Sequence, residues 1–291
     1  MKQPATAAQK PSGLVGLASA AIESIKINST TLETRNRRTL LVKHRRWGSE
    51  LVAMIANLFF WLSGSPIHVW VRAKSWQRWE IRCFHLLYNG RFHVFTRGGR
   101  TLYTEKFAGQ NLLEHLNRKT LDGQALRAAA RELRRAHGLR CDEFGCGFWS
   151  HGDPHLENVV YDEAADRARL VDFEIIHKKS LSALERHADD LLVFLQDLVG
   201  RVSREKWLPM ALYFVKAYGR DDVIAELTKL LVVPRGITGI WWKLRTEYLS
   251  RRELVRRFAA LRRALCNHLA NRNVVRQRQA FEFPEPWLKT T

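Results

Sequence analysis

The sequence predicts an α+β protein, because it contains both strand-like and helix-like patterns. Short apolar runs separated by turn residues occur at 39–43, 91–104 and 159–171, and this pattern is typical of strands and hairpins. Apolar residues recur at helical spacing over 75–87 and 251–269. With 291 residues, 46% of them hydrophobic, the chain has ample apolar content for a core without a second domain.

Residues 149–174 are the most informative stretch, because they carry acids and an amide at the spacing of a phosphoryl-transfer site. In the protein-kinase catalytic loop an Asp accepts the proton of the attacking hydroxyl, and an Asn five residues later holds Mg²⁺. Asp153 and Asn158 have that interval, and His151 precedes Asp153 by two residues, where that loop also carries His. The spacing predicts Asp153 as the catalytic residue and His151 as a scaffold for the loop.

A second metal-binding Asp is expected one short hairpin later. Residues 159–161 and 168–171 are apolar enough for two strands, and 162–167 form a charged turn between them. This hairpin would bring Asn158 and Asp172 to the same end, so we expect these two residues to hold the metal.

Several details separate this pattern from the protein kinases. His155 stands where protein kinases carry Lys, Glu174 replaces the Gly of the metal-binding motif, and no Ala-Pro-Glu motif follows. The chain therefore resembles the small-molecule branch of the protein-kinase-like superfamily, especially the bacterial lipopolysaccharide core kinases that phosphorylate Kdo or heptose, and more distantly the aminoglycoside and choline phosphotransferases. The resemblance is specific over residues 149–195. It implies a bilobal protein-kinase-like fold, with a small β-rich N-lobe and a mainly helical C-lobe, and it implies ATP and Mg²⁺ as cofactors.

The resemblance also implies an N-terminal lobe in which a strand lysine holds the nucleotide phosphates and pairs with a helix glutamate. Lys43 ends the apolar run 39–43, and Glu80 lies in the helical pattern 75–87, so we assign these two residues as the pair. Lys74 is a poorer lysine, because it belongs to the start of the same helix as Glu80. Glu50 is the alternative glutamate.

The segments that would enclose the nucleotide are assigned from their order along the chain. No glycine-rich loop precedes Lys43, and residues 28–36 offer hydroxyls and amides in its place. After a hairpin over 91–104, the backbone of about Glu105 to Phe107 is expected to bind the adenine.

The second half of the motif supplies structural support. Asp190 lies near the start of a predicted helix over 188–199 and is expected to brace the catalytic loop, with Asp189 as the alternate. His155 and Glu157 either face the acceptor or have a structural role.

We expect three regions along the chain: a flexible tail over 1–27, an N-lobe over 28–107 with an apolar insertion at about 50–64, and a C-lobe over 108–291 with basic C-terminal helices. The four cysteines form neither a disulfide framework nor a zinc pattern. A reducing cytoplasm is the simpler compartment.

Residues 51–62 are apolar apart from one Asn, and they are too short for a membrane span of about twenty residues. They form a buried helix of an enlarged lobe, an interfacial helix that dips into the bilayer, or a partner-binding face. The net charge of +19 concentrates in 35–46 and 251–278, which predicts attraction to polyanions. An anionic membrane surface and a glycolipid substrate are such partners, so we expect a cytoplasmic protein that is peripheral on the inner membrane.

The function predicted from these observations is Mg²⁺-dependent transfer of phosphate from ATP to a sugar hydroxyl of lipopolysaccharide core or another lipid-linked glycan. Polycationic aminoglycosides fit the motif but not the charge. No zinc finger or RNA-binding signature is present, so direct nucleic-acid binding is not expected. The alternatives are a protein or other small-molecule kinase and a non-catalytic, kinase-like membrane scaffold.

Overall fold

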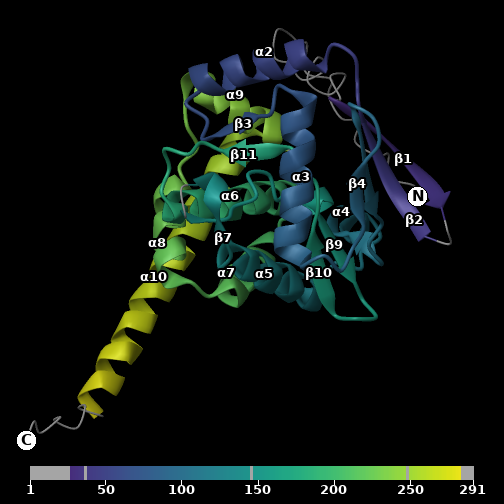
Figure 1. Cartoon of the computed structure of the whole chain (residues 1–291). Helices are drawn as coiled ribbons and strands as arrows, with labels where there is room; N and C mark the ends of the chain where they lie inside the picture. Colours follow the sequence, from purple (N-terminus) through teal and green to yellow (C-terminus); the bar gives the residue numbers. More distant parts are fainter. Residues whose placement is uncertain (1–26, 36–37, 145–146, 247–248, 283–291) are drawn as a thin grey trace, which may run out of the picture. The chain divides into compact units, whose positions relative to one another are not determined.

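The computed structural model describes residues 27–35, 38–144, 147–246 and 249–282, and these residues divide into two compact units (Figure 1). Unit 1 comprises the described residues up to 106 together with 235–244, and unit 2 comprises 107–234 and the described residues from 245 onward. The mixed α and β composition predicted from the sequence is confirmed, with small antiparallel sheets and several long helices. The bilobal kinase arrangement stays a prediction.

A four-stranded antiparallel sheet in the order β1-β2-β5-β4 forms the sheet of unit 1. Its strands are β1 (Asn28–Arg35), β2 (Arg38–Arg45), β4 (Val94–Thr96) and β5 (Thr101–Glu105). The hairpin predicted over 91–104 is confirmed as β4 and β5. Residues 28–35 pair with β2 along their whole length, so the segment expected to cover the phosphates is a strand.

Three helices and one short strand complete unit 1. They are α2 (Ser49–Leu62), β3 (Ile67–Val69), α3 (Ala73–Tyr88) and α9 (Gly236–Arg245). The helix predicted over 75–87 is confirmed as α3, and its buried residues include Trp76, Trp79 and Cys83. Leu102 of β5 is also fully buried. The core of unit 1 therefore combines one face of α3 with the inner residues of the central strands.

Unit 2 contains a three-stranded antiparallel sheet in the order β10-β9-β6. Its strands are β6 (Gln110–Asn111), β9 (Val159–Asp162) and β10 (Arg167–Leu170), and a second pair consists of β7 (Arg140–Cys141) and β8 (Gly147–Phe148). The hairpin predicted over 159–171 is confirmed as β9 and β10. The 3-10 helix η2 (Leu156–Asn158) leads into β9, and β11 (Ile175–His177) follows β10. Another 3-10 helix, η1 (Asp142–Phe144), lies between β7 and β8.

Helix α6 (Ala183–Arg201) is the central helix of unit 2, because most of its residues are buried. It begins five residues earlier than the sequence predicts, because Ser182 and Glu185 form a capping box that starts the helix there. The other helices of unit 2 are α4 (Leu112–Asn117), α5 (Gly123–His137), α7 (Trp207–Tyr218), α8 (Asp221–Leu230) and α10 (Arg251–Glu282).

The C-terminal basic segment is the long helix α10, which packs against α7 and α8 (Figure 1). Leu254, Phe258, Leu261 and Leu265 of its apolar stripe are buried, as predicted for core packing. Among the described residues, no helix is both long and apolar enough to cross a bilayer.

Candidate active site

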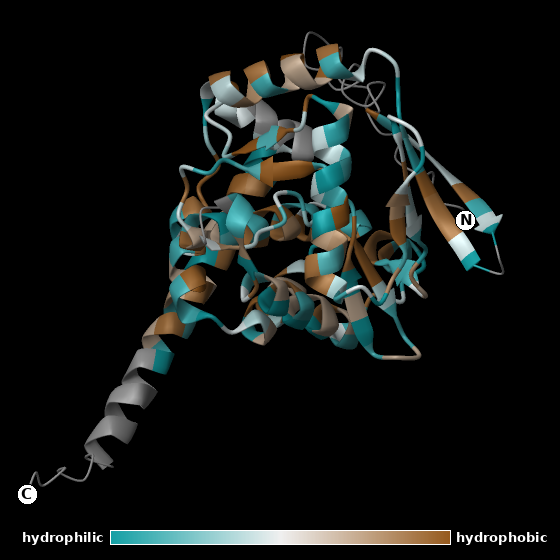
Figure 2. Cartoon of the chain, in the orientation of Figure 1, coloured by the Kyte–Doolittle hydropathy of each residue, from teal (hydrophilic) through white to brown (hydrophobic). Residues whose placement is uncertain are grey.

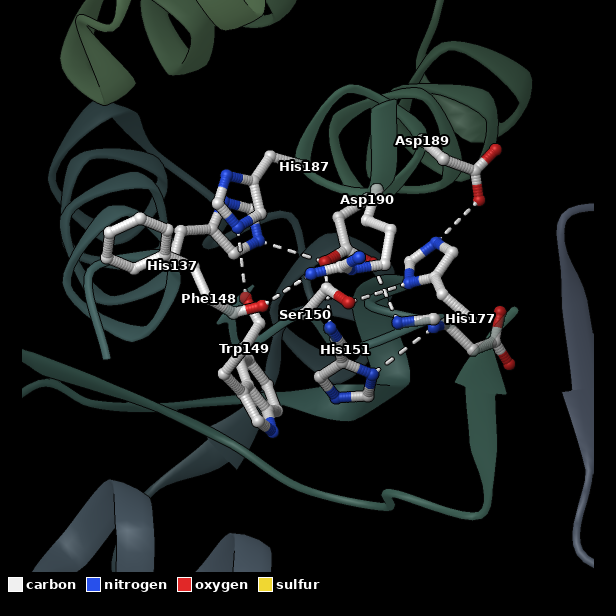
Figure 3. A network of polar contacts seen from close by, with 12 residues as sticks. His137, Phe148, Trp149, Ser150, His151, His177, His187, Asp189 and Asp190 are labelled. Atoms are coloured by element: carbon white, nitrogen blue, oxygen red, sulfur yellow. Dashed lines mark hydrogen bonds and ion pairs between the residues drawn. The ribbon is translucent and has the colours of Figure 1, made fainter. Parts of the chain in front are cut away.

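The loop that carries Asp153 is held by one buried carboxylate of α6. Asp190 accepts hydrogen bonds from the backbone N–H of His151 at 2.8 Å and of Gly152 at 2.7 Å (Figure 3). The Nε2 atom of His137, at the end of α5, donates to the same carboxylate at 2.9 Å. Asp190 has no solvent exposure. A carboxylate that accepts several N–H groups in a dry site fixes the loop strongly, because charge-assisted hydrogen bonds are about twice as strong as neutral ones.

Two stacked histidines extend this brace. The rings of His137 and His187 lie 3.9 Å apart and nearly parallel (Figure 3). His187 donates from Nε2 to the carbonyl of Trp149 at 3.0 Å, just before the catalytic loop. Burial lowers the pKa of His187 to about 3 and also lowers the pKa of His137. Both rings are therefore neutral at pH 7, and each uses its single N–H for the contacts described.

Asp189 and Asp190 have different partners. Asp189 lies 3.1 Å from Nε2 of His177, whose Nδ1 lies 2.9 Å from the hydroxyl of Ser150 (Figure 3). Burial raises the pKa of Asp190, but His177 and the hydrogen bond from His137 lower it by more, so the net pKa lies below the ordinary value. Asp190 is therefore the ionised residue that contacts the loop backbone, whereas Asp189 acts only through His177 and Ser150.

His151 connects the catalytic loop to the strand that precedes Asp172. Its Nε2 donates to the carbonyl of Val171 at 3.0 Å, and its Nδ1 accepts from the backbone N–H of Asp153 at 3.2 Å. The imidazole is buried, and burial lowers its pKa. The neutral ring of His151 therefore joins the two segments by hydrogen bonds.

Asn158 is oriented by the loop itself. Its Nδ2 donates to the carbonyl of Asp153 at 2.9 Å, which turns Oδ1 away from that carbonyl. Its backbone carbonyl accepts from Val171 N at 3.0 Å, so Asn158 is tied to the strand that leads to Asp172. Asp172 has φ 66°, a left-handed conformation that non-glycine residues adopt only under local constraint.

An amide oxygen and a carboxylate are suitable ligands for Mg²⁺, which is usually bound by one or two carboxylates together with water and substrate phosphates. Asn158 and Asp172, joined by one hairpin, fit this donor set. Within the described residues, no cluster of three or more His, Cys, Asp or Glu could hold a metal.

In unit 1, the structure brings Lys43 of β2 and Glu80 of α3 together. Lys43 Nζ lies 2.8 Å from Glu80 Oε1, and the side chains are 7% and 0% exposed. The indole N–H of Trp76 donates to the same oxygen at 3.3 Å. The alternative Glu50 instead pairs with Arg100 at 2.7 Å, and Lys74 is exposed.

The segment expected to bind adenine is partly used by the sheet. Glu105 N donates to His93 O at 2.8 Å, and Lys106 N donates to Thr39 O at 2.9 Å. Phe107 begins unit 2 and is buried. The backbone N–H groups of Glu105 and Lys106 are therefore used within the sheet, and adenine binding by this segment stays a prediction.

His155 and Glu157 lie in the loop between Asp153 and β9. His155 Nε2 is 3.7 Å from the Asp153 carboxylate, and its Nδ1 accepts from Glu157 N at 3.3 Å. Glu157 itself is exposed. His155 therefore caps the N-terminus of η2, which favours a structural role for it over contact with the acceptor.

Sequence reasoning missed His137, His187, His177 and Asp197. Asp197 accepts from the backbone N–H of Leu156 at 3.0 Å, and it lies seven residues after Asp190. That interval places both acids on one face of α6, which is a signal available from the sequence. No comparable signal marks the histidines, because their partners are distant along the chain.

No protein-family model and no curated protein matches this chain. The structure is similar to that of an ethanolamine kinase from Plasmodium vivax, with 10% sequence identity and a TM-score of 0.40 over 90% of this chain and 91% of the other. It is also similar to the bifunctional kinase-methyltransferase WbdD, with 18% identity and a TM-score of 0.36 over 74% of this chain and 42% of that protein. The functional assignment therefore depends on the residues of the site themselves.

Proposed function

We propose that the protein is a Mg²⁺- and ATP-dependent phosphotransferase that acts on a sugar hydroxyl. The observation that carries this proposal is a set of hydrogen bonds that joins the Asp153 loop, Asn158 and the strand leading to Asp172. His151 contacts both the loop and the strand, and Asp190 fixes the loop. Such pre-organisation is the main contribution that a protein makes to phosphoryl transfer.

Each residue then has a defined task. Asp153 orients the acceptor hydroxyl and takes its proton as the oxygen attacks the γ-phosphate, and ADP leaves. Asn158 and Asp172 would hold Mg²⁺, which when bound would supply positive charge to neutralise the transferring phosphoryl group. Lys43 binds nucleotide phosphates, and Glu80 positions its ammonium group.

A cavity of about 780 Å³ in unit 2 is our candidate for the acceptor site. Asp197 links it to the catalytic loop, because its carboxylate accepts from Leu156 N and also binds the guanidinium of Arg201, which lines the cavity. The cavity lies at the C-terminal ends of α4 and α6. Its lining residues are Leu116, Asn117, Lys119, Leu121, Gly200, Arg201, Val202, Ser203, Lys206, Met210 and Leu249.

The charge of this lining favours an anionic acceptor. Lys119 and Lys206 contribute cations, the charge of Arg201 is paired with Asp197, and none of the described lining residues is acidic. A sugar that carries carboxylate or phosphate groups, as in a lipopolysaccharide core, would be attracted, whereas a polycationic aminoglycoside would be repelled. We therefore propose a lipid-linked anionic glycan as the acceptor and the cytoplasmic membrane face as the place of reaction.

The acceptor class can be tested by supplying ATP labelled in the γ-phosphate, with Mg²⁺, to four acceptor sets in parallel. These are a lipopolysaccharide or glycolipid extract, free anionic sugars, small amino alcohols such as ethanolamine, and a generic protein substrate. We expect label in the glycolipid, and we expect Lys119→Glu to weaken transfer to it by raising KM more than it lowers kcat. Val232→Glu, a change at an exposed residue outside the cavity, is the matched control.

The alternatives give different results. If only the protein substrate or only the amino alcohols become labelled, the acceptor belongs to that class of compound and is not a sugar. Nucleotide binding without transfer to any acceptor would favour a non-catalytic, kinase-like scaffold and contradict the proposal.

A further inference from the structure

Helix α2 presents an apolar face to solvent. Its side chains at 51, 55, 58 and 62 follow helical spacing, and those at 54 and 61 lie beside them. Figure 2 shows hydrophobic residues along this helix. The exposed members are Leu51 (60%), Met54 (51%), Ile55 (58%), Leu58 (56%), Trp61 (69%) and Leu62 (55%). Apolar side chains scattered singly are normal on a surface, but a continuous stripe of six marks an interaction site.

The opposite side of α2 is fixed to unit 1, so the orientation of the exposed face is defined. Ala53 and Phe60 are buried. Asn57 donates to Val69 O at 2.9 Å and accepts from Val69 N at 2.8 Å, which ties the helix to β3. Thr238 of α9 donates to the carbonyl of Ser63 at 2.8 Å, directly after the helix. The stripe therefore projects outward from a docked helix.

Cations lie at the N-terminal end of this face. At the N-terminal end Arg46 is exposed, and the guanidinium of Arg100 lies 4.5 Å from the ring centroid of Trp47. Glu50, the single acid of α2, is paired with Arg100. Residues 27–106 contain fourteen Lys or Arg and four Asp or Glu. The exposed Arg46 and the net positive charge of these residues thus favour an anionic partner.

Two tryptophans bound the stripe. Trp47 is 84% exposed and Trp61 is 69% exposed. Tryptophan is enriched at the boundary between lipid headgroups and hydrocarbon, because its indole is apolar with one polar N–H. The helix has 14 residues and is about 21 Å long at 1.5 Å per residue, so it fits in the plane of an interface rather than across a bilayer.

We infer that the exposed face of α2 is a bilayer-docking surface that inserts between anionic lipid headgroups, with Arg46 at its N-terminal end contacting those headgroups. Exposed apolar side chains on one face, a cation beside the helix and exposed tryptophans are features of an interfacial helix. A protein groove would accept the apolar stripe, but it would not account for the excess of cations. The inference does not depend on phosphoryl transfer.

Flotation of the full-length protein with lipid vesicles tests this inference. The vesicles contain either phosphatidylcholine alone or phosphatidylcholine with 30 mol% phosphatidylglycerol, at about 0.1 M and 0.5 M NaCl, which spans strong and weak electrostatic screening. We expect binding to the anionic vesicles that is at least about tenfold stronger than to the neutral ones and that weakens with salt. The double variant Ile55→Glu/Leu58→Glu should lower the partition coefficient by about a hundredfold, since two inserted side chains are lost.

Leu32→Glu is the matched control. Leu32 is 58% exposed and Leu58 is 56% exposed, but Leu32 lies on β1, outside the stripe. It should bind vesicles within about twofold of the wild type, since it removes no inserted side chain. Asp153→Asn should float like the wild type, which keeps this result separate from any failure of transfer. Equal flotation of the wild type and the α2 double variant would overturn the inference. Light scattering tests the alternative that a second copy of the chain covers this face. If the wild type does not bind vesicles and the α2 double variant differs from it in oligomeric state, a second copy of the chain replaces the bilayer as the partner.

Discussion

Replacing Lys43 and Glu80 singly and together by methionine separates the structural role of their ion pair from its role in binding nucleotide. The pair is 2.8 Å long and almost fully buried. Removing one partner leaves the other charge buried without compensation, which costs about 3–5 kcal/mol. Replacing both by apolar side chains of similar volume is often neutral or stabilising. We therefore expect each single variant to lose about 3–5 kcal/mol of unfolding free energy and the double variant to lose less than about 2 kcal/mol.

The assay is urea unfolding followed by tryptophan fluorescence and circular dichroism. Losses that simply add in the double variant would refute the reasoning, because they would show that the two residues are not energetically coupled. Calorimetric titration with MgATP supplies the functional half of the test. The double variant is folded but lacks the cation, so its affinity should fall by about ten- to a hundredfold, the value of one charge-assisted phosphate contact.

Lys74→Met is the matched control for this experiment, because Lys74 is an exposed lysine of the same helix that carries Glu80. It should change neither unfolding nor MgATP affinity. A Lys43→Met/Glu80→Met double variant that binds MgATP as tightly as the wild type would remove Lys43 from the nucleotide site.

Three further predictions concern the brace of the catalytic loop. Asp190→Asn should destabilise unit 2 by about 3–5 kcal/mol, because the amide of the new asparagine cannot accept from every N–H that the carboxylate binds. It should also lower turnover more than it lowers MgATP affinity. An unchanged urea unfolding midpoint would contradict this prediction. Gly152→Ala should also reduce turnover and stability, because Gly152 has φ 90° and an added Cβ would lie 2.9 Å from Ile175 O, whereas Gly99→Ala, which meets no neighbour, serves as its control. Because burial lowers the pKa of His137, His151 and His187, the unfolded chain binds more protons below about pH 6.5, and stability should fall with acidification by up to about 1.4 kcal/mol per pH unit for each histidine. Urea midpoints at pH 7.5 and 5.0 measure this slope, and equal midpoints would rule out neutral buried histidines.

The hairpin of β9 and β10 was predictable because its signals are local. Asp153, Asn158 and Asp172 follow one another within twenty residues, and the intervening strands alternate in the expected way. The contact between Lys43 and Glu80 joins residues 37 positions apart, yet each lies in an element whose pattern is clear by itself. The hairpin and the contact between Lys43 and Glu80 were therefore predictable, because the sequence pattern of a single helix or strand decides which way each side chain points.

Other features depend on tertiary context. Residues 28–35 are polar on both faces, so no alternation reveals the strand β1, which pairs with β2 while remaining mostly exposed. The hydropathy of residues 51–62 is the same whether the helix is buried or exposed, and only the packing of α2 shows which face projects outward. His137 lies among the alanines and arginines of α5, and nothing in that sequence identifies Asp190 as its partner.

The most direct test of the account is Mg²⁺-dependent transfer of the labelled γ-phosphate of ATP to glycolipid by the wild type and three variants. Asp153→Asn should slow turnover by at least about a hundredfold, the usual contribution of a general base, and Asp172→Ala should abolish the dependence on Mg²⁺ together with the activity. Glu163→Gln removes a 69% exposed carboxylate from the same hairpin and should leave turnover unchanged. Transfer by Asp153→Asn at the wild-type rate, in a protein that binds MgATP normally, would contradict the central claim that this loop performs the chemistry.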